Sequence, residues 1–252
     1  MTTNILLETR ALSRNFGALV AAREIDFRLE AGARHALIGP NGAGKTTFIN
    51  LLTGVLRPSE GQILLRGEDI TEIAQADRVK RGIARTFQIN RLFRGLTVLE
   101  NVYIAVSERL GAAATMLAPA GKRLDVIEES MHLLETLNLQ DDAHLRISEL
   151  PYGRQRLVEI AIALGLKPEV LLLDEPAAGV PSAESHIILN AIDELPKHIG
   201  VLIIDHDMDL VFRFAQRITV LVQGAVYAEG TPKEIGANAD VRAVYLGQAE
   251  HG

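Results

Sequence analysis

Apolar and polar positions follow two different patterns along the chain. From Leu6 to Phe27 they alternate between turn-forming segments, which predicts an antiparallel β-region. Later, short apolar runs alternate with stretches of helical spacing, and the runs predict buried strands. The expected strands are His35–Ile38, Gln62–Leu65, Val170–Leu173, Val201–Ile204 and Ile218–Val222. Strands that alternate with helices indicate an α/β fold with a mainly parallel sheet core.

One segment, from about residue 94 to residue 150, interrupts this alternation because it shows helical spacing and no clear strand. Apolar residues recur there at helical intervals with acidic residues on the opposite face, at Leu124, Ile127, Met131, Leu134 and Leu137. Two further helices are expected at Thr46–Thr53 and Arg154–Leu164. We therefore expect a single domain over residues 1–252, in which a helical subdomain is inserted into the sheet domain.

Composition narrows the class of protein. The 252 residues carry a net charge of −6 and no run of five like charges, which disfavours sequence-independent binding of nucleic acid. The absence of cysteine excludes disulfides and thiolate metal sites. The most apolar segments, Ile160–Leu166 and Val170–Leu173, are far shorter than the roughly 20 residues of a membrane-spanning helix. We expect a soluble chain whose membrane role, if any, comes through a partner.

A complete P-loop pattern lies between an expected strand and an expected helix. It reads Gly39-Pro40-Asn41-Gly42-Ala43-Gly44-Lys45-Thr46. In such a loop, backbone N–H groups and the helix N-terminus surround phosphate groups, and glycines permit the close approach. Lys45 would supply a positive charge for the phosphates, and the Thr46 hydroxyl would bind Mg²⁺. A glycine turn with an incidental lysine is the alternative, but the strand–loop–helix context disfavours it.

Two adjacent carboxylates end a later apolar strand. Asp174 and Glu175 directly follow the run Val170–Leu173. In P-loop ATPases an aspartate in this place holds Mg²⁺, and the next glutamate can polarise the attacking water. Acidic residues often end buried strands for structural reasons alone. Together with the P-loop, however, the pair predicts a site that binds and hydrolyses ATP with Mg²⁺.

The order of these motifs resembles that of the ABC transporter ATPases over nearly the whole chain. The matching segments are Gly39–Thr47, Gln88 within Thr86–Gln88, Leu150–Arg156, Leu171–Pro176 and His206 within Ile204–Asp207. Other segments resemble the ATP-binding subunits of branched-chain amino acid importers in particular: Arg85–Phe93, Leu96–Asn101, Glu175–Gly179 and Ala243–Gly247. Importers of urea or other amides share similar stretches. The resemblance implies a P-loop NTPase fold and a family-like C-terminal tail over about 225–252.

The resemblance also implies roles for single residues. Phe16 would stack on adenine, although a core phenylalanine in a β-region is an alternative. Gln88 would contact Mg²⁺ and the attacking water, and Thr47 would lie in the nucleotide site. His206 would contact the γ-phosphate, with a satisfied structural histidine as the alternative.

The signature loop of the family departs here from its usual Leu-Ser-Gly-Gly-Gln. This chain has Leu150, Pro151, Tyr152, Gly153 and Arg154. Proline has neither a hydroxyl nor an N–H, so at least one contact with the γ-phosphate of an opposing subunit would be lost. In the family, the loop after the residue that corresponds to Glu175 usually carries an Asp or Asn, and this chain has Pro181 there. The resemblance thus implies that this chain offers a second subunit a weakened half-site.

The resemblance implies the following partners. Two copies, or this chain and a paralogue, would enclose two ATP–Mg²⁺ between them, and permease subunits would dock near the Gln88 loop. The substrate-binding protein would act indirectly, and nucleic acid would not be bound. The chain would then be cytoplasmic and peripheral on the inner face of the cell membrane. Leu92 and Phe93 look exposed and are candidates for the docking surface, with a core position as an equal alternative.

Two other functions stay open at this point. A soluble ABC ATPase that acts on DNA or ribosomes would carry a long coiled-coil insertion or a second ATPase domain, and the sequence shows neither. A regulatory subunit that binds ATP without turnover would fit the altered signature loop. Lys45, Glu175 and His206 argue against that second alternative.

Overall fold

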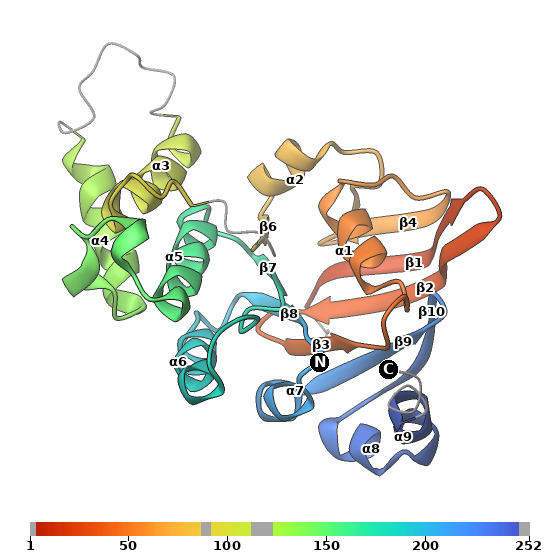
Figure 1. Cartoon of the computed structure of the whole chain (residues 1–252). Coiled ribbons are helices and arrows are strands. Elements are labelled where there is room, and N and C mark those ends of the chain that lie inside the picture. Colours follow the sequence, from red (N-terminus) through yellow and green to blue (C-terminus); the bar gives the residue numbers. More distant parts are fainter. Residues whose placement is uncertain (1–3, 87–91, 112–122, 247–252) are drawn as a thin grey trace. The chain divides into compact units, whose positions relative to one another are not determined.

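The computed structural model describes residues 4–86, 92–111 and 123–246, and these form two compact units (Figure 1). We call them the sheet unit and the helical unit. The sheet unit consists of Met1–Ile83, Glu169–Glu175 and Pro196–Gly252. The helical unit consists of Ala84–Pro168 and Pro176–Leu195.

The larger sheet has the strand order β10-β9-β3-β8-β7-β6. Its strands are β3 (Arg34–Ile38), β6 (Ile83–Arg85), β7 (Val170–Asp174), β8 (Gly200–Ile204), β9 (Arg217–Val222) and β10 (Ala225–Gly230). β3 pairs in parallel with β8 and β9, β7 pairs in parallel with β8, and β10 is antiparallel to β9. The predicted mainly parallel core is confirmed. The carboxyl ends of β3, β7 and β8 share one edge, which is where ligands bind in such sheets.

The second sheet is antiparallel and confirms the β-region expected near the N-terminus. It has the order β2-β1-β4-β5 and consists of β1 (Ile5–Phe16), β2 (Leu19–Glu30), β4 (Glu60–Leu65) and β5 (Glu68–Asp69). A two-residue turn at Gly17 and Ala18 joins β1 to β2. Alternation of buried and exposed positions along β2 gives this strand one face for the core.

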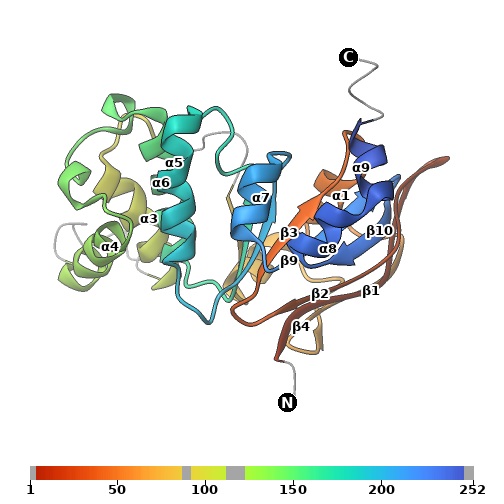
Figure 2. The ribbon, with the colours of Figure 1, turned by 90° about the horizontal axis from the view of Figure 1, so that it is seen from below.

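Helix α1 (Lys45–Thr53) packs into the core of the sheet unit, where the phenyl rings of Phe27 and Phe48 meet edge to face with centroids 5.5 Å apart. The remaining helices of the unit are α2 (Gln75–Lys80), α7 (Met208–Phe214), α8 (Pro232–Ala237) and α9 (Ala239–Leu246). α8 packs on β10, and α9 leads on from it toward the C-terminus (Figure 2).

The helical unit is built from α3 (Val98–Arg109), α4 (Leu124–Thr136), α5 (Tyr152–Gly165) and α6 (Ser182–Asp193), with short 3₁₀ turns at Gln140–Asp142 and Ile147–Glu149. α3 contacts both α4 and α5. Thr97 and Glu100 form a reciprocal capping box that starts α3. In the described part of the chain, no helix has the length and apolar character needed to cross a membrane.

The buried face of α4 differs from the predicted one. Leu124 is 66% exposed, so its assignment to the inner face was wrong. Leu134 and Leu137 are buried as expected, and Val126 and Ser130 are buried as well. Ser130 can lie inside because its hydroxyl donates to the carbonyl of Val126 at 2.7 Å. The apolar spacing in the sequence therefore predicted the helix and the burial of Leu134 and Leu137 correctly, and the position of Leu124 incorrectly.

Candidate active site

The P-loop connects β3 to α1 at the edge formed by the carboxyl ends of the parallel strands. A Cβ atom on Gly39 would lie 2.3 Å from the carbonyl oxygen of Leu221, and one on Gly44 would lie 2.4 Å from that of Ala21. Both obstacles are backbone atoms, so no side-chain rotation can relieve the clash. Gly44 also has φ of +99°, which disfavours any residue with a Cβ. These glycines let the loop pack directly against the neighbouring strands.

Lys45 lies at the first position of α1 and folds over the loop. Its Nζ donates to the carbonyl oxygens of Gly39 at 2.5 Å and Pro40 at 3.0 Å. Burial lowers the pKa of the Lys45 amine, and the carboxylates of Glu175 and Asp174 oppose that shift. The ammonium group therefore belongs to the same electrostatic cluster as the two predicted acidic residues. Of the other loop side chains, Asn41 and Thr46 are exposed and Thr47 is partly buried.

Asp174 and Glu175 leave β7 at this same edge. Asp174 is the last residue of the strand and is 4% exposed, whereas the Glu175 side chain is 27% exposed. The N–H of Glu175 donates to the carbonyl of Ile204 at 2.8 Å, which fixes its backbone beside β8. Its φ of +47° lies in the left-handed region, which residues with a Cβ rarely adopt. Strain of this kind is concentrated at functional sites.

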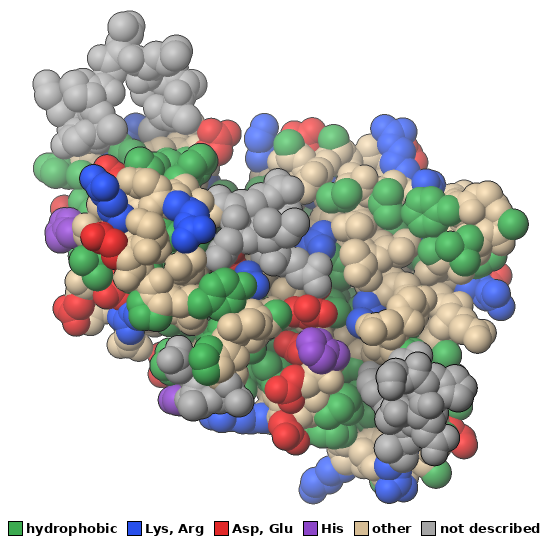
Figure 3. All heavy atoms as spheres, viewed as in Figure 1, with side chains coloured by type: hydrophobic (Ala, Val, Ile, Leu, Met, Phe, Trp, Pro, Cys, Tyr) green, Lys and Arg blue, Asp and Glu red, His purple; other side chains and the backbone are tan. Residues whose placement is uncertain are grey.

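His206 follows β8 and points into solvent. Its side chain is 70% exposed, which disfavours the alternative of a satisfied structural histidine. Its Nδ1 lies 3.6 Å from Glu175 Oε1 and 3.8 Å from Asp205 Oδ1. Figure 3 shows acidic side chains gathered with a histidine over the part of the sheet unit near α7. The structure thus brings together P-loop, carboxylate pair and histidine from separate strand ends.

Asp205 is a site residue that the sequence interpretation missed. It is 3% exposed, and its Oδ1 accepts the N–H groups of His206 at 2.7 Å and Asp207 at 2.9 Å. Burial raises the pKa of the Asp205 carboxyl, while these backbone hydrogen bonds oppose the rise. An acidic residue directly before His206, at the end of a predicted strand, was the available signal.

Phe16 ends β1 in the sheet unit. Its side chain is 43% exposed, so the alternative of a core phenylalanine is wrong. The Arg14 guanidinium carbon lies 4.7 Å from the ring centroid, which covers the ring with a cation. Gln88, predicted to contact Mg²⁺ and the attacking water, lies outside the described residues.

The signature segment begins α5 in the helical unit. Pro151 is the N-cap residue and offers no side-chain hydrogen bond. Arg154 forms an ion pair with Asp142, and its Nη2 donates to the carbonyl of Asn138 at 2.9 Å. Its charge is therefore neutralised within the helical unit.

The loop that contains Pro181 contacts the signature segment. Gly179 has φ of +76°, and a Cβ there would lie 3.0 Å from Cε1 of Tyr152. The Arg156 guanidinium carbon lies 5.0 Å from the centroid of the Tyr152 ring. Pro181 itself is exposed and begins α6 without a side-chain cap. The signature loop and the loop after Glu175 are thus packed together in the helical unit.

The two candidate docking residues differ in exposure. Phe93 is 58% exposed, as expected, but Leu92 is only 7% exposed, so its predicted exposure was wrong. Leu92 lines a mostly apolar cavity of about 150 Å³ together with Thr86 and three side chains of α5, including Ile162. Its side chain is drawn inward because α5 supplies apolar partners.

The donors near the P-loop fit a magnesium ion. Mg²⁺ prefers oxygen ligands and usually keeps waters and phosphate oxygens alongside one or two protein ligands. Thr46 offers an exposed hydroxyl at the start of α1, and Asp174 offers a carboxylate at the end of β7. Among the described residues no group of three or more His, Cys, Asp or Glu could hold a metal ion. The oxygen-only donor set thus suits Mg²⁺ bound together with phosphates.

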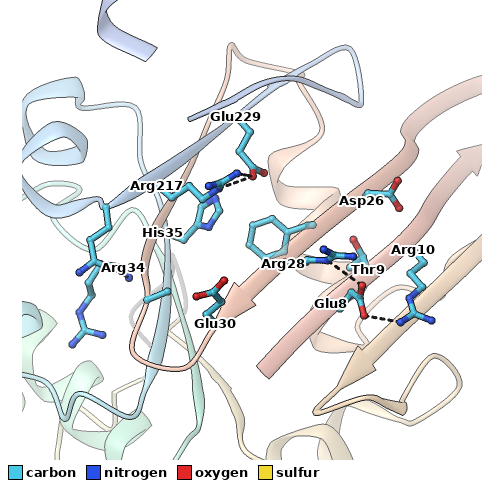
Figure 4. Close-up of a pocket in the computed structure, with 13 residues that line it drawn as sticks. Glu8, Thr9, Arg10, Asp26, Arg28, Glu30, Arg34, His35, Arg217 and Glu229 are labelled. Atoms are coloured by element: carbon cyan, nitrogen blue, oxygen red, sulfur yellow. Dashed lines mark hydrogen bonds and ion pairs between the residues drawn. The ribbon is translucent and has the colours of Figure 1, made fainter. Parts of the chain in front are cut away.

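A cavity of about 670 Å³ lies at the opposite end of β3 from the P-loop (Figure 4). Its lining carries charges of both signs, and several of these side chains pair with one another. Arg10 and Arg28 both contact Glu8, and Arg217 contacts Glu229. Charges neutralised in this way leave little net potential for a polyphosphate, which needs converging cations. This cavity is therefore not the nucleotide site.

His35 forms the base of that cavity and is 2% exposed. Its Nε2 lies 2.8 Å from the Thr219 hydroxyl oxygen, and that hydroxyl donates to Glu229 at 2.9 Å. Because the hydroxyl has a single proton, His35 Nε2 must carry the proton in its own hydrogen bond. Burial lowers the pKa of His35 to about 4. The imidazole is therefore neutral and structural near pH 7.

Comparisons with known proteins agree with this geometry. The family model described as ABC transporter matches residues 22–178, and the model described as branched-chain amino acid ATP-binding cassette transporter matches residues 228–251. The high-affinity branched-chain amino acid transport ATP-binding proteins BraF of Pseudomonas aeruginosa and LivG of Escherichia coli are each 39% identical over 251 residues, covering 97% of this chain and 98% of the relative.

A solved structure agrees as well. The ADP conformation of MJ1267, an ATP-binding cassette of an ABC transporter, superimposes with a TM-score of 0.86 and 32% identity. The match covers 97% of this chain and 100% of that one. The likeness therefore extends over both units of the chain.

Proposed function

This chain belongs to the ABC transporter family as an ATP-hydrolysing subunit that drives transport, and we propose that its transporter imports branched-chain amino acids. The C-terminal segment carries the proposal, because residues 228–251 match the family model specific to branched-chain amino acid cassettes. The relatives named for such transport also align along nearly the entire chain. Import of urea or another amide is the competing function.

In this proposal the nucleotide phosphates lie over the loop 39–47. The Lys45 ammonium, now held by two loop carbonyls, turns to the phosphate oxygens, and the N-terminus of α1 adds positive potential. Thr46 and Asp174 hold Mg²⁺, which when bound neutralises charge on the phosphates. The exposed face of Phe16 stacks on the adenine.

Hydrolysis then depends on the edge formed by β7 and β8. Glu175 accepts the proton of the attacking water, and its fixed backbone holds the carboxylate in place. His206 contacts the γ-phosphate from the neighbouring strand end, 3.6 Å from the glutamate. Gln88 belongs to the same proposal through the family resemblance.

A second ATPase subunit completes each site in this proposal. The first N–H groups of a helix have no intrahelical acceptor, and α5 begins at Pro151 without a side-chain cap. A helix terminus of this kind favours an anion, so α5 of one subunit fits the γ-phosphate held by the other. The second subunit is a copy of this chain or a paralogue.

Permease subunits dock, in this proposal, on the helical unit around Phe93. The exposed phenyl ring supplies an apolar anchor of the kind that is enriched at protein interfaces. Leu92, the residue before Phe93, lines a small apolar cavity, and this cavity offers space for a partner side chain. Membrane association follows from this contact.

Uptake measurements test the substrate class. We would reconstitute the chain in liposomes with the permease and second ATPase subunits encoded beside it, and supply the matching substrate-binding protein. We expect ATP-driven uptake of leucine, isoleucine and valine, and none of urea or acetamide. Lys45→Ala should abolish uptake, whereas Arg57→Ala, at a largely exposed ion pair with Glu72, should leave it unchanged. Uptake of urea without leucine would replace the proposed substrate by the amide alternative.

A further inference from the structure

We propose that Asp205 is a positioning residue for ATP hydrolysis, and that its buried carboxylate fixes the turn that presents His206 toward Glu175. The inference rests on the proposed role of His206 at the γ-phosphate. It assigns to Asp205 no contact with nucleotide or water. Its function is exerted through the backbone of the following residue.

The hydrogen bonds of Asp205 define the turn between β8 and α7. One carboxylate oxygen, Oδ1, accepts two successive N–H groups, from His206 at 2.7 Å and from Asp207 at 2.9 Å. Hydrogen bonds to an ionised acceptor are roughly twice as strong as neutral ones. The side chain is 3% exposed, so water does not compete with these bonds. The backbone of His206 is thereby tied to the end of β8.

The His206 ring, in contrast, has little to hold it. In the described part of the chain its only polar contacts are the carboxylate oxygens at 3.6 Å and 3.8 Å, which are longer than hydrogen bonds. The ring is also 70% exposed, so packing does not fix it. Its location beside Glu175 therefore depends on where the turn places its Cα. Loss of the turn would displace the imidazole without any change in the imidazole itself.

The arrangement costs folding free energy, which argues for a functional reason. Burial of a carboxylate is unfavourable, and the nearby negative charge of Glu175 makes it more so. A turn with only a structural role can be closed by an exposed acceptor, as Asp207 does at the start of α7. Placing two carboxylates close together around one histidine is instead typical of a site that orients a reacting group.

Asp207 provides a matched control two residues away. Its Oδ1 also accepts two backbone N–H groups, from Asp209 at 3.0 Å and Leu210 at 3.2 Å, but it caps α7 and is exposed. Removal of either aspartate deletes two hydrogen bonds in the same turn region. Only Asp205 holds the N–H of His206. A merely structural effect would make the two variants alike.

The test is steady-state ATPase kinetics of the assembled transporter with Asp205→Ala, Asp205→Asn, Asp207→Ala, His206→Ala and the double variant Asp205→Ala/His206→Ala. We expect Asp205→Ala to lower kcat at least tenfold with KM for ATP within threefold of wild type. Asp205→Asn keeps an acceptor oxygen and should recover most of that loss, and Asp207→Ala should stay within threefold. The double variant should be no slower than His206→Ala alone, because both changes remove the same contribution.

Several results would overturn the inference. One is an Asp205→Ala kcat within threefold of wild type, and another is an Asp207→Ala variant whose kcat falls by as much as that of Asp205→Ala. An Asp205→Asn variant as slow as Asp205→Ala, or a double variant whose loss of kcat is the product of the two single losses, would overturn it as well. If Asp205→Ala does not fold, Asp205→Ser replaces it, since its hydroxyl is too short to span both N–H groups; an unchanged kcat would again overturn the inference. An unaffected His206→Ala would instead contradict the proposed role of His206.

Discussion

Glu175 combines a strained backbone with a partly buried carboxylate, next to the buried carboxylate of Asp174. The strain is tolerated because its N–H is bonded to β8 on one side while Asp174 pairs in the ladder just before it. A backbone held in this way limits how far the side chain must reorganise when it accepts a proton, which favours catalysis. The backbone geometry of Glu175 thus bears directly on hydrolysis.

Glu175→Gln should retain ATP binding and lose most hydrolysis. The amide has nearly the same shape, but it cannot accept the proton of the attacking water. We expect turnover in the assembled transporter to fall by at least tenfold, with the calorimetric affinity for ATP close to wild type. Glu169→Gln, a matched change at the Arg66 ion pair, is the control and should alter neither quantity. Turnover of Glu175→Gln within threefold of wild type, less than about 1 kcal/mol of barrier, would exclude Glu175 as the base.

At the scale of elements, the C-terminal end of α1 is held by another part of the sheet unit. Arg78 of α2 is 1% exposed, and its guanidinium donates to the carbonyls of Leu51 and Leu52 at 2.7 Å and 2.9 Å. It also donates to the carbonyls of Ile73 and Thr71. The Leu51 carbonyl also accepts the N–H of Gly54 at 3.2 Å, so Arg78 adds a charged donor at the end of α1. Arg78 thus ties the helix that carries the P-loop to the following segment.

Arg78→Ala should lower the free energy of unfolding by about 3 kcal/mol, because several buried carbonyls lose a charged donor. Urea denaturation monitored by circular dichroism measures this change. Arg57→Ala, at an ion pair whose side chains are more than 70% exposed, should change it by less than about 0.5 kcal/mol. Equal midpoints for the two variants would show that the buried guanidinium is dispensable.

If the second subunit is a paralogue with serine in its signature loop, the N-terminus of α5 predicts an asymmetry between the two nucleotide sites. With Pro151 in place of serine, the site on the partner lacks one hydroxyl donor, worth roughly 1.5 kcal/mol if charge-assisted. Pro151→Ser should therefore raise turnover at the site formed with the partner's P-loop by about tenfold. Single-site rates, measured with the glutamate base of each subunit disabled in turn, give this number. Equal rates at both sites in the unmodified complex would contradict the asymmetry.

At the scale of the whole molecule, His35 couples the packing of both sheets to pH. Its ring lies 4.8 Å from that of Phe27 on β2 and is neutral in the folded chain. The pKa of His35 falls from an ordinary 6.5 to about 4 through burial. As the pH falls, His35 therefore becomes protonated at a higher pH in the unfolded chain than in the folded chain. The stability contributed by neutral His35 is present above pH 6.5 and is lost as the pH falls toward 4.

Replacement of His35 by Gln should remove this part of the pH dependence. At pH 4, protonation of His35 should have lowered the free energy of unfolding of the wild-type chain by roughly 3 kcal/mol. His35→Gln should therefore show a flatter decline of this free energy between pH 6.5 and pH 4. Urea titrations at several pH values measure the two slopes. His132→Gln, on a side chain that is 79% exposed, is the control and should follow wild type. Parallel slopes for His35→Gln and wild type would exclude His35 as the titrating group.

Much of the fold could be predicted because its signals are local. The expected strand Val170–Leu173 differs from β7 by one residue, and the P-loop pattern predicts the connection between β3 and α1. Such features depend on side-chain spacing and on glycines within a few residues of one another. One error concerns the start of a helix. The spacing of apolar residues put Leu124 inside, but this first residue of α4 is 66% exposed, whereas Val126 is buried among contacts with α3 and α5.

By itself the sequence determined the strand and helix pattern, the P-loop and the acidic pair, since each is encoded in contiguous residues. Only the tertiary structure decided that His206 stands 3.6 Å from Glu175 and that Asp205 is buried behind it. The physical reason is the parallel pairing of β7 with β8, which sets Asp174 beside Ile204 and so brings both strand ends to one place. Contacts between segments distant in sequence arise from sheet register, and local spacing carries no record of it.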